Sequence, residues 1–422
     1  MKRSTAHLNK DSKKSSGAVA RRDFIKTAAA AGAGLVIIRP ESVYGAPANS
    51  AIRLGIIGCG GRGNSVANDF IRNTETRVVG LADLFDDQLS ATRDRFDKVA
   101  EEKGYAKISP SQIFKGSKAY QELVQSEVDV VLITSPPYFH PEHFEAAVAA
   151  GRHVYLEKPV ATDVYGCKRI LKAGERAQGK ISVHVGFQTR YAPPFREMVQ
   201  RIHSGAIGDI ACAQAYYYSG ALRRKDKEGM SPTEARIRNW VFDKVLSGDI
   251  LVEQNVHVVD VCNWVMQGHP VKAVGTGGRK VRTDVGDCWD HYITIFYYPN
   301  DVKISLNSTQ FLKGWGDVAE RFFGSKGVAE AHYRGGVRIL GENGWDAGVD
   351  NSLERTMPEK VKAFIDSIKS GKFENQIQQG TESTLSAIMG RTAAYTGKEM
   401  TWDKMIKSNE RWDARLNLDS LD

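Results

Sequence analysis

Residues 51–71 read AIRLGIIGCGGRGNSVANDFI, and this stretch decides the fold. A short apolar run leads into a glycine-rich turn, and a helical spacing of apolar residues follows the turn. A second apolar run, TRVVGLAD at 76–83, comes next. Strand, glycine-rich turn, helix and strand in this order predict a βαβ unit of a parallel sheet.

The turn contains the pattern G-x-G-x-x-G, with Gly58, Gly60 and Gly63. Glycines at these places permit a tight turn and let the backbone approach a pyrophosphate at the helix N-terminus. Asp83 ends the second strand, where a carboxylate can accept hydrogen bonds from ribose hydroxyls. A carboxylate there repels a 2′-phosphate, so we expect NAD rather than NADP. The alternative, a glycine-rich turn without a ligand, does not explain Asp83.

Candidate strands and helices keep alternating as far as residue 188. This alternation predicts an α/β fold with a doubly wound parallel sheet, a Rossmann domain, over residues 49–188. Beyond it the strands become longer and aromatic, and YPND and GSKG are typical of hairpin turns. We therefore predict a second, α+β domain over 189–422 with a large, mostly antiparallel open sheet. Its helices are expected at about 249–266, 357–369 and 382–396.

The net charge of +8 is concentrated at the start of the chain. Residues 1–48 contain nine Lys and Arg and three acids, a surplus of six, which leaves +2 for the remainder. A nearly neutral remainder gives no support to nucleic-acid binding.

Residues 1–48 have the order of a processing segment rather than of a domain. Arg21 and Arg22 precede the apolar run TAAAAGAGLVII at 27–38, which is too short to span a membrane. The leader resembles a twin-arginine export signal. The alternatives are a dibasic start to an ordinary secretory signal and a membrane-anchoring helix. We expect a periplasmic or cell-envelope protein that meets a membrane only through an uncleaved leader.

The stretch GDILVEQNVHVVD at 248–260 reads as an apolar helix that carries Glu253, His257 and Asp260. Spacings of four and three place these side chains on one stripe. A metal half-site would need a third ligand, so no metal is predicted. Five widely spaced cysteines without a C-x-x-C pair indicate neither a disulfide scaffold nor a zinc site. A core histidine bonded to Asp260 or to backbone is the remaining alternative.

Glu157-Lys158-Pro159 follows a predicted strand, downstream of the glycine-rich turn and of TSPPYFH at 134–140. In this order the motifs resemble the Gfo/Idh/MocA family of glucose-fructose oxidoreductase and inositol dehydrogenase. The resemblance extends over everything after the leader, including GRTAAYTGKEMTWDKM at 390–405. It implies a nicotinamide cofactor in the first domain, a sugar or polyol in the cleft, and a homodimer or homotetramer.

The resemblance also implies roles for single residues. Lys158 would lie beside the nicotinamide and the substrate hydroxyl, where a fixed cation stabilises alkoxide character; an ion pair with Glu157 is the alternative. Family members carry an aspartate and, four residues on, a histidine over the substrate, and Glu253 and His257 stand at those positions. His257 is suited to take the hydroxyl proton. Glu253 would bind a neighbouring hydroxyl or orient the imidazole, and its extra methylene alters the pocket.

The remaining candidates are contacts to cofactor or substrate. Cofactor contacts are expected from Gly58, Gly60, Arg62, Gly63, Asp83, Pro136, His140, Glu157, Lys158 and Gln188. Substrate contacts are expected from Arg190, Tyr191, Trp240, Trp289 and His291. Interdomain or sheet packing is the alternative for many of these residues. The stretch LRRKDKEGMSPTEARIRNW at 222–240 is expected to form a loop over the cleft that sets specificity.

We expect an exported NAD-dependent oxidoreductase that transfers hydride between a sugar, glycoside or polyol hydroxyl and a tightly bound nicotinamide cofactor. One alternative is an NAD-dependent glycosidase, in which transient oxidation of a ring carbon permits elimination. A second is a sugar-sensing protein without turnover, against which the intact Lys158 and His257 argue.

Overall fold

Six parallel strands in the order β3-β2-β1-β4-β5-β6 form the first sheet of the chain. The structure, a computed structural model, describes residues 51–349 and 351–422, so the predicted leader lies outside the described residues. The strands are β1 (Ile52–Ile57), β2 (Thr76–Asp83), β3 (Ile113–Lys115), β4 (Val130–Ile133), β5 (His153–Leu156) and β6 (Val183–Val185). The predicted doubly wound parallel sheet is confirmed.

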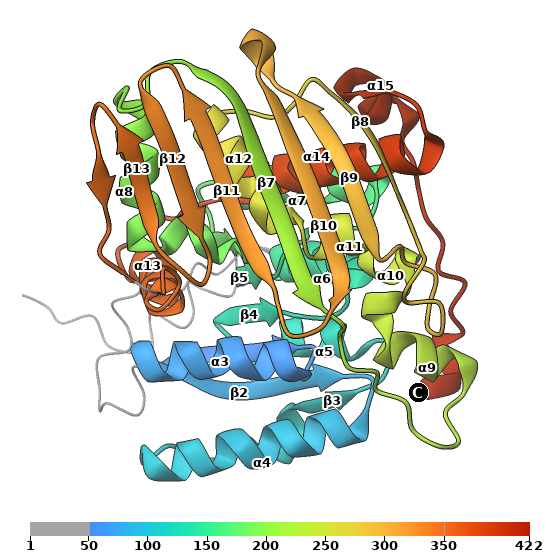
Figure 1. Cartoon of the computed structure of the whole chain (residues 1–422). Helices are drawn as coiled ribbons and strands as arrows, with labels where there is room; N and C mark the ends of the chain where they lie inside the picture. The colour runs from blue at the N-terminus through green and yellow to red at the C-terminus, as the bar shows by residue number, and fades with distance from the viewer. Residues whose placement is uncertain (1–50, 350) are drawn as a thin grey trace, which may run out of the picture. The chain divides into compact units, whose positions relative to one another are not determined.

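Helices cover both faces of this sheet (Figure 1). They are α3 (Gly61–Asn73), α4 (Asp86–Glu102), α5 (Ala119–Gln125), α6 (His140–Ala149) and α7 (Val164–Ala177). All four residues of β4, from Val130 to Ile133, are fully buried, which explains why the strand is apolar on both sides. The strand order reverses between β1 and β4, and ligands of such sheets bind at the carboxyl ends of the strands there.

The second sheet has nine strands in the order β14-β13-β12-β11-β7-β10-β9-β8-β15. Among them only β7 and β10 run parallel, so the predicted mostly antiparallel sheet is confirmed. YPND joins β9 to β10 and GSKG joins β11 to β12, as expected. The strands are β7 (Ile210–Gly220), β8 (Lys272–Gly278), β9 (His291–Tyr297), β10 (Lys303–Leu312), β11 (Asp317–Gly324), β12 (Gly327–His332), β13 (Val337–Gly341), β14 (Trp345–Asp346) and β15 (Met400–Thr401).

Helices pack on one face of the second sheet and leave the other face open (Figure 1). The helices of this half of the chain are α8 (Pro193–His203), α9 (Pro232–Arg238), α10 (Lys244–Ser247), α11 (Ile250–Glu253), α12 (Val256–Met266), α13 (Thr356–Lys369), α14 (Ile377–Thr396) and α15 (Trp402–Ser408), of which α9 lies beside the Rossmann half instead. α13 packs against α3 and α14 packs against α7, so the two halves share one core. The boundary at 188 stays a prediction. No helix of the described ranges is long and apolar enough to cross a membrane.

The helix predicted over 249–266 is divided, and this part of the prediction is wrong. α11 ends at Glu253, Gln254 and Asn255 form a turn, and α12 begins at Val256. The apolar spacing continues through the turn because Val252 and Val256 are both fully buried, so the sequence pattern does not show the break. Glu253 therefore ends one helix, and the residue four positions later lies in the first turn of the next.

Candidate active site

The glycine-rich turn fits a dinucleotide. Gly58 has a φ of +94°, and a Cβ there would lie 2.6 Å from the backbone nitrogen of Ser135. A Cβ at Gly63 would lie 2.2 Å from the carbonyl oxygen of Gly58. A Cβ at Gly60 would meet nothing within 4 Å, which leaves open space at the N-terminus of α3. The first and third glycines are thus required by the fold, and the second leaves room for a pyrophosphate.

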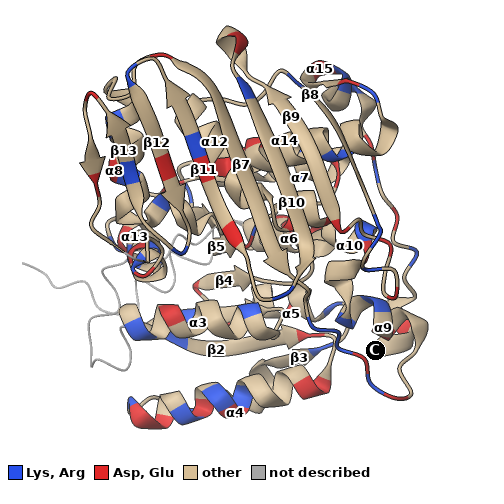
Figure 2. Cartoon of the chain, in the orientation of Figure 1, with Lys and Arg blue, Asp and Glu red and all other residues tan. Residues whose placement is uncertain are grey.

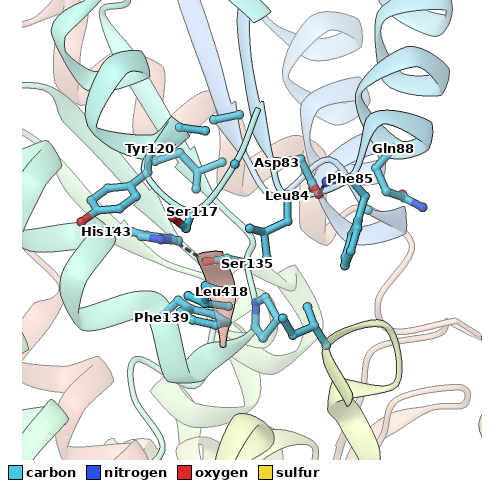
Figure 3. A pocket seen from close by; sticks show the side chains of 18 of the residues that line it. Asp83, Leu84, Phe85, Gln88, Ser117, Tyr120, Ser135, Phe139, His143 and Leu418 are labelled. Atoms are coloured by element: carbon cyan, nitrogen blue, oxygen red, sulfur yellow. Dashed lines mark hydrogen bonds between the residues drawn. The ribbon is translucent and has the colours of Figure 1, made fainter. Parts of the chain in front are cut away.

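A cavity of about 220 Å³ lies at the carboxyl ends of β1 to β4, beside this turn (Figure 3). Four of the predicted cofactor residues line it: Gly58, Gly60, Asp83 and Pro136. Lining residues that the sequence patterns did not indicate include Phe85, Gln88, Ser117, Ser135, Phe139, His143, Lys225, Ile237, Arg238, Leu418 and Asp419. The cavity does not reach the predicted catalytic residues.

Asp83 is held by backbone at the edge of this cavity. Its Oδ2 accepts the N–H of Cys59 at 2.7 Å and its Oδ1 accepts the N–H of Phe85 at 3.0 Å. Burial raises the pKa of the Asp83 carboxyl, and these backbone donors oppose the shift. Each carboxylate oxygen keeps a further acceptor site, so the group can still bind the ribose hydroxyls that the sequence predicts.

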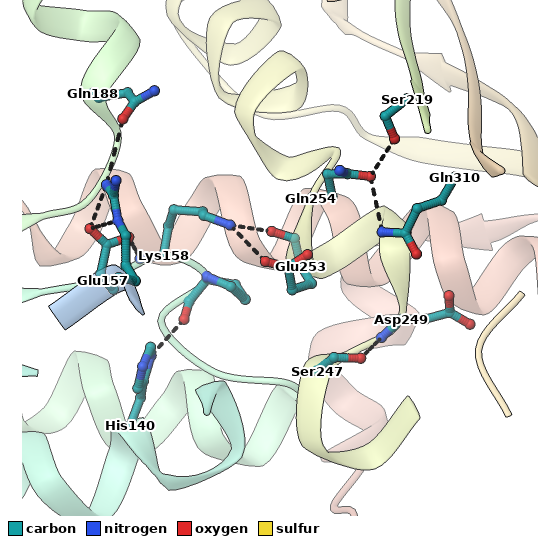
Figure 4. A network of polar contacts seen from close by, with 12 residues as sticks. His140, Glu157, Lys158, Gln188, Ser219, Ser247, Asp249, Glu253, Gln254 and Gln310 are labelled. Atoms are coloured by element: carbon teal, nitrogen blue, oxygen red, sulfur yellow. Dashed lines mark hydrogen bonds and ion pairs between the residues drawn. The ribbon is translucent and has the colours of Figure 1, made fainter. Parts of the chain in front are cut away.

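The loop after β5 is tied to the glycine-rich turn through Glu157 (Figure 4). Arg62 donates to Glu157 Oε1 from Nε at 3.0 Å and from Nη2 at 2.8 Å, and Nη2 also reaches Gln188 Oε1 at 3.5 Å. Glu157 is only 4% exposed and packs against Gly186, where a Cβ would lie 2.6 Å from its Oε2. The expected alternative, an ion pair between Lys158 and Glu157, is not what the structure shows.

His140 links two loops that border the same region. Its Nδ1 lies 2.8 Å from the carbonyl oxygen of Pro159 and its Nε2 lies 2.8 Å from that of Ser135. Burial lowers the pKa of His140 to about 4, and a neutral ring donates to only one of these carbonyls. His140 therefore contributes by holding the loops together.

Lys158 pairs with Glu253 across the two halves of the chain (Figure 4). Lys158 Nζ lies 3.1 Å from Glu253 Oε1 and also donates to the backbone carbonyl of Glu253. The two side chains are 12% and 15% exposed, so the pair is largely shielded from water. It joins the loop after β5 to the end of α11, and it places a fixed cation beside a carboxylate.

His257 lies in the first turn of α12 with its imidazole in a positively charged environment. Burial and the charges of Lys158, Arg62 and Lys360 hold the pKa of His257 well below its usual value. Its Nδ1 is buried and has no hydrogen-bond partner among the described residues. A neutral imidazole has one nitrogen that can accept a proton, although the lowered pKa makes this ring a weaker base than an ordinary histidine.

The alternative considered for His257, a hydrogen bond to Asp260, is not formed, and Asp260 is bonded to other groups. Arg190 donates to both carboxylate oxygens, at 2.8 and 3.0 Å, and Ser383 donates to Oδ1 at 2.7 Å. In the described part of the chain, no group of three or more His, Cys, Asp or Glu side chains could hold a metal ion.

The predicted substrate residues are dispersed. Arg190 is engaged by Asp260, and the buried Tyr191 is bonded to Gln376. Trp240 lines the cavity beside the glycine-rich turn, together with Lys225, Ile237 and Arg238. The stretch 222–240, predicted as a loop over the substrate cleft, contains the helix α9.

The other two predicted substrate residues lie at the start of β9, with Trp289 in the loop before it and His291 as its first residue. Trp289 stacks on Tyr395 with ring centroids 4.0 Å apart, and His291 Nδ1 lies 2.7 Å from Asp290 Oδ1. None of the five candidates bonds to the catalytic candidates in the part of the chain that the structure describes. Their contact with substrate stays a prediction.

A polar network that no sequence pattern indicated lies directly beside Glu253 (Figure 4). Gln254 Oε1 accepts hydrogen bonds from Ser219 Oγ and from Gln310 Nε2, each at 3.2 Å. These residues come from the turn after α11 and from β7 and β10, so only the folded sheet brings them together. The network supplies amide and hydroxyl groups of the kind that bind sugar hydroxyls.

Comparisons with known proteins agree with this geometry. Residues 52–187 match the family model "Oxidoreductase family, NAD-binding Rossmann fold", and residues 195–330 match the "GFO/IDH/MocA C-terminal domain". "Inositol 2-dehydrogenase 3" of Saccharopolyspora erythraea is 28% identical over 257 residues, which are 60% of this chain and 65% of that protein, just under two thirds of its length. "Myo-inositol 2-dehydrogenase" of Thermotoga maritima is 24% identical over 353 residues, which are 81% of this chain and 95% of that protein.

A solved structure has the same fold. "Levoglucosan dehydrogenase, complex with NADH and levoglucosan" aligns with a TM-score of 0.66 at 17% identity, over 83% of this chain and 99% of that one. The two family models together match more than half of the present chain. This chain therefore belongs to the Gfo/Idh/MocA family of oxidoreductases, whose first domain is an NAD-binding Rossmann fold.

Proposed function

We propose that this chain oxidises a secondary hydroxyl of a sugar, glycoside or polyol and retains its nicotinamide cofactor between turnovers. The observation that carries the proposal is the convergence of Lys158, Glu253 and the neutral His257 on one region beyond the dinucleotide turn. Relatives named inositol 2-dehydrogenases and a solved levoglucosan dehydrogenase support a polyhydroxylated substrate.

Each of the three residues has a separate task in this proposal. Bound NAD supplies the hydride acceptor. His257 takes the hydroxyl proton as the carbon is oxidised, because its ring is neutral and its Nδ1 is unpaired. Lys158 stabilises the negative charge that develops on the oxygen. Glu253, now bonded to Lys158, accepts a hydrogen bond from a neighbouring hydroxyl.

The test is absorbance at 340 nm of the concentrated protein, without added nucleotide, while sugars, glycosides and polyols are supplied singly. A rise towards one equivalent per site supports the proposal and identifies the electron donor. Release of free sugar from a glycoside without a lasting rise would replace it with the NAD-dependent glycosidase. Tight sugar binding without either signal would favour a sugar sensor. Protein that neither contains nor binds nicotinamide nucleotide would refute it altogether.

We infer export from the leader, with the periplasm or cell envelope as the destination. Arg21 and Arg22 ahead of the apolar run support a twin-arginine route, which carries folded proteins and so allows a bound cofactor to be exported. Replacing both arginines by lysine should leave the folded protein inside the cell. Unchanged export of this variant would exclude the twin-arginine route.

We also propose a homo-oligomer formed through the open face of the second sheet. Apolar side chains on this side of the molecule are unusually exposed, with Ile293 at 52%, Trp315 at 62% and Leu340 at 49%. Figure 2 shows charged residues on β11 and β12, whereas β9 carries none. Light scattering of the Ile293→Lys variant tests the proposal: a smaller particle than the parent supports it, and a monomeric parent refutes it.

A further inference from the structure

A segment far from the Rossmann domain in the sequence lines part of the cavity beside the glycine-rich turn. Residues 409–422, here called the strap, contain one short 3-10 helix, Leu418–Leu421, and Leu418 and Asp419 line the cavity itself. Figure 3 shows Leu418 beside Phe139 and Ser135. The strap therefore forms part of the wall of the cavity that the glycine-rich turn also lines.

The strap is fixed to the Rossmann helices at its start. The backbone carbonyl of Glu410 accepts from the N–H of Tyr165 at 2.9 Å, and the backbone N–H of Trp412 donates to Asp163 Oδ2 at 2.6 Å. The Glu410 carboxylate also pairs with Arg391 at 2.9 Å. These contacts hold the strap where it leaves α15.

The middle of the strap is held from both sides. The N–H of Ala414 donates to the hydroxyl of Tyr138 at 3.3 Å, and its carbonyl accepts from Arg236 Nη1 at 2.8 Å. Beyond this point its leucines enter an apolar cluster at the edge of the cavity. That cluster contains Leu84, Phe85, Tyr138, Phe139, Ile237, Trp240, Val245, Leu246, Ala414, Leu416, Leu418 and Leu421.

Asp422, the last residue of the strap, is bonded to the loop after β3. The hydroxyl of Ser117 donates to Asp422 Oδ2 at 2.7 Å, and the backbone N–H of Ser117 donates to Asp422 Oδ1. Ser117 lines the cavity, so this contact joins the strap to the part of the cavity wall that follows β3.

A second element, α9, also lines the cavity, through Ile237 and Arg238. Arg238 lines the cavity, donates to both carboxylate oxygens of Asp87 at 2.9 and 3.1 Å, and lies 3.9 Å over the ring of Phe85. Asp87 lies in the first turn of α4, so this contact fastens the second half of the chain to the end of the cavity where Asp83 lies. In Rossmann domains that end receives the adenosine ribose.

We propose that the strap and α9 together form a closure over the adenosine end of the dinucleotide site, and that release of the cofactor requires the strap to detach. The inference rests on the proposed function, since it explains how an exported oxidoreductase keeps its cofactor. Detachment breaks the contacts at Asp422, Ala414 and the apolar cluster before the cavity opens, so release is slower than from an open site.

Release of NADH from the purified full-length protein tests this inference. The protein is loaded with NADH and mixed with a large excess of NAD, and the loss of bound-NADH fluorescence is followed. Three changes are compared: Asp422→Ala, Ser117→Ala, and a chain that stops after Arg415. Asp94→Ala is the matched control, because Asp94 is an exposed carboxylate on α4 without a hydrogen bond in the described part of the chain.

The chain that stops after Arg415 should release NADH at least about tenfold faster, and the two point variants severalfold faster, as expected for the loss of one or two hydrogen bonds. The double variant of Ser117 and Asp422 should behave like Asp422→Ala alone, because Asp422→Ala already removes both hydrogen bonds to Ser117, whereas Ser117→Ala removes only the one from the hydroxyl. Folded variants that release NADH at the parent rate would refute the role of the strap in cofactor release, without affecting the proposal that the protein is an oxidoreductase. A parent that binds no nucleotide would instead remove the proposed function.

Discussion

The two ends of the dinucleotide site are built by different means. The adenosine end is a cavity whose form depends on glycine backbone, strand ends and covering segments. The end that we propose for the nicotinamide depends on side-chain charge, with Lys158 paired to Glu253 and His257 held neutral beside them. In the proposed function the first end binds the cofactor, and the second stabilises the charge that develops on the substrate during oxidation. Substitutions should therefore separate binding from turnover.

The largest effect is expected at the nicotinamide end. Lys158→Met removes the cation that stabilises the developing negative charge, so kcat should fall by about 10²–10³-fold while bound nucleotide stays at the parent level. Single-turnover absorbance at 340 nm and the nucleotide content after gel filtration measure the two quantities. Lys362→Met, on the exposed side of α13, is the control. Equal losses of nucleotide and of turnover would contradict a division between the ends.

His257→Asn should lower kcat by about 10²-fold, again without loss of nucleotide. The parent gives a sharper test through pH. A base works only when neutral, and the pKa of His257 is held well below 6.5, so kcat/KM should stay level as pH falls through 6.5 and decline only below it. A decline centred at 6.5 or above would show that another group is the base.

Gly63→Ala should weaken binding of NAD at the adenosine end. The Cβ of an alanine at position 63 would lie 2.2 Å from the Gly58 carbonyl oxygen. Relief of this clash requires the backbone of the turn to shift. We expect NAD to bind about tenfold more weakly or worse, with kcat at saturating NAD nearly unchanged. Gly268→Ala, where a Cβ would meet nothing within 4 Å, is the control for titrations with NAD. Parent-like affinity in a folded Gly63→Ala protein would count against the turn as the binding element.

The smallest effect is expected on the stability of the fold, from a substitution at Glu320 that leaves both ends of the dinucleotide site unchanged. Both carboxylate oxygens of Glu320 are buried without a hydrogen-bond partner among the described residues, and burial raises the pKa of Glu320 well above 4.5. The folded state then binds more protons than the unfolded state above pH 4.5, so stability falls as pH rises through that value. Glu320→Gln should add about 1–3 kcal/mol to the free energy of unfolding near pH 8 and less near pH 4.5. Urea unfolding at both pH values measures it, and an equal change at both would refute the explanation.

The adenosine end was partly predictable because its signals are local. Gly58, Gly60, Gly63 and Asp83 stand at fixed distances around one turn, and alternating apolar runs predict the parallel sheet around them. The covering segments give no such signal. Ser117 and Asp422 meet across 305 positions, and nothing in either neighbourhood indicates the other.

At the nicotinamide end the residue types were predictable but their arrangement was not. The turn at Gln254 and Asn255 is hidden because the buried valines keep a helical spacing across it. Arg190 shows the opposite difficulty, since a charged residue after a strand suggests a ligand contact, whereas its guanidinium is bonded to the buried Asp260. Pairing between distant charged residues is decided by tertiary structure and not by local pattern.

The ion pair between Lys158 and Glu253 competes with any ligand that would bind to either of these two side chains. A ligand that engages either charge has to replace the partner that this charge already has, and the apparent affinity falls accordingly. A lone hydroxyl replaces only one of the two contacts, whereas two adjacent hydroxyls replace both. In the proposed function, this contact would therefore disfavour simple alcohols relative to vicinal diols before the shape of the pocket acts.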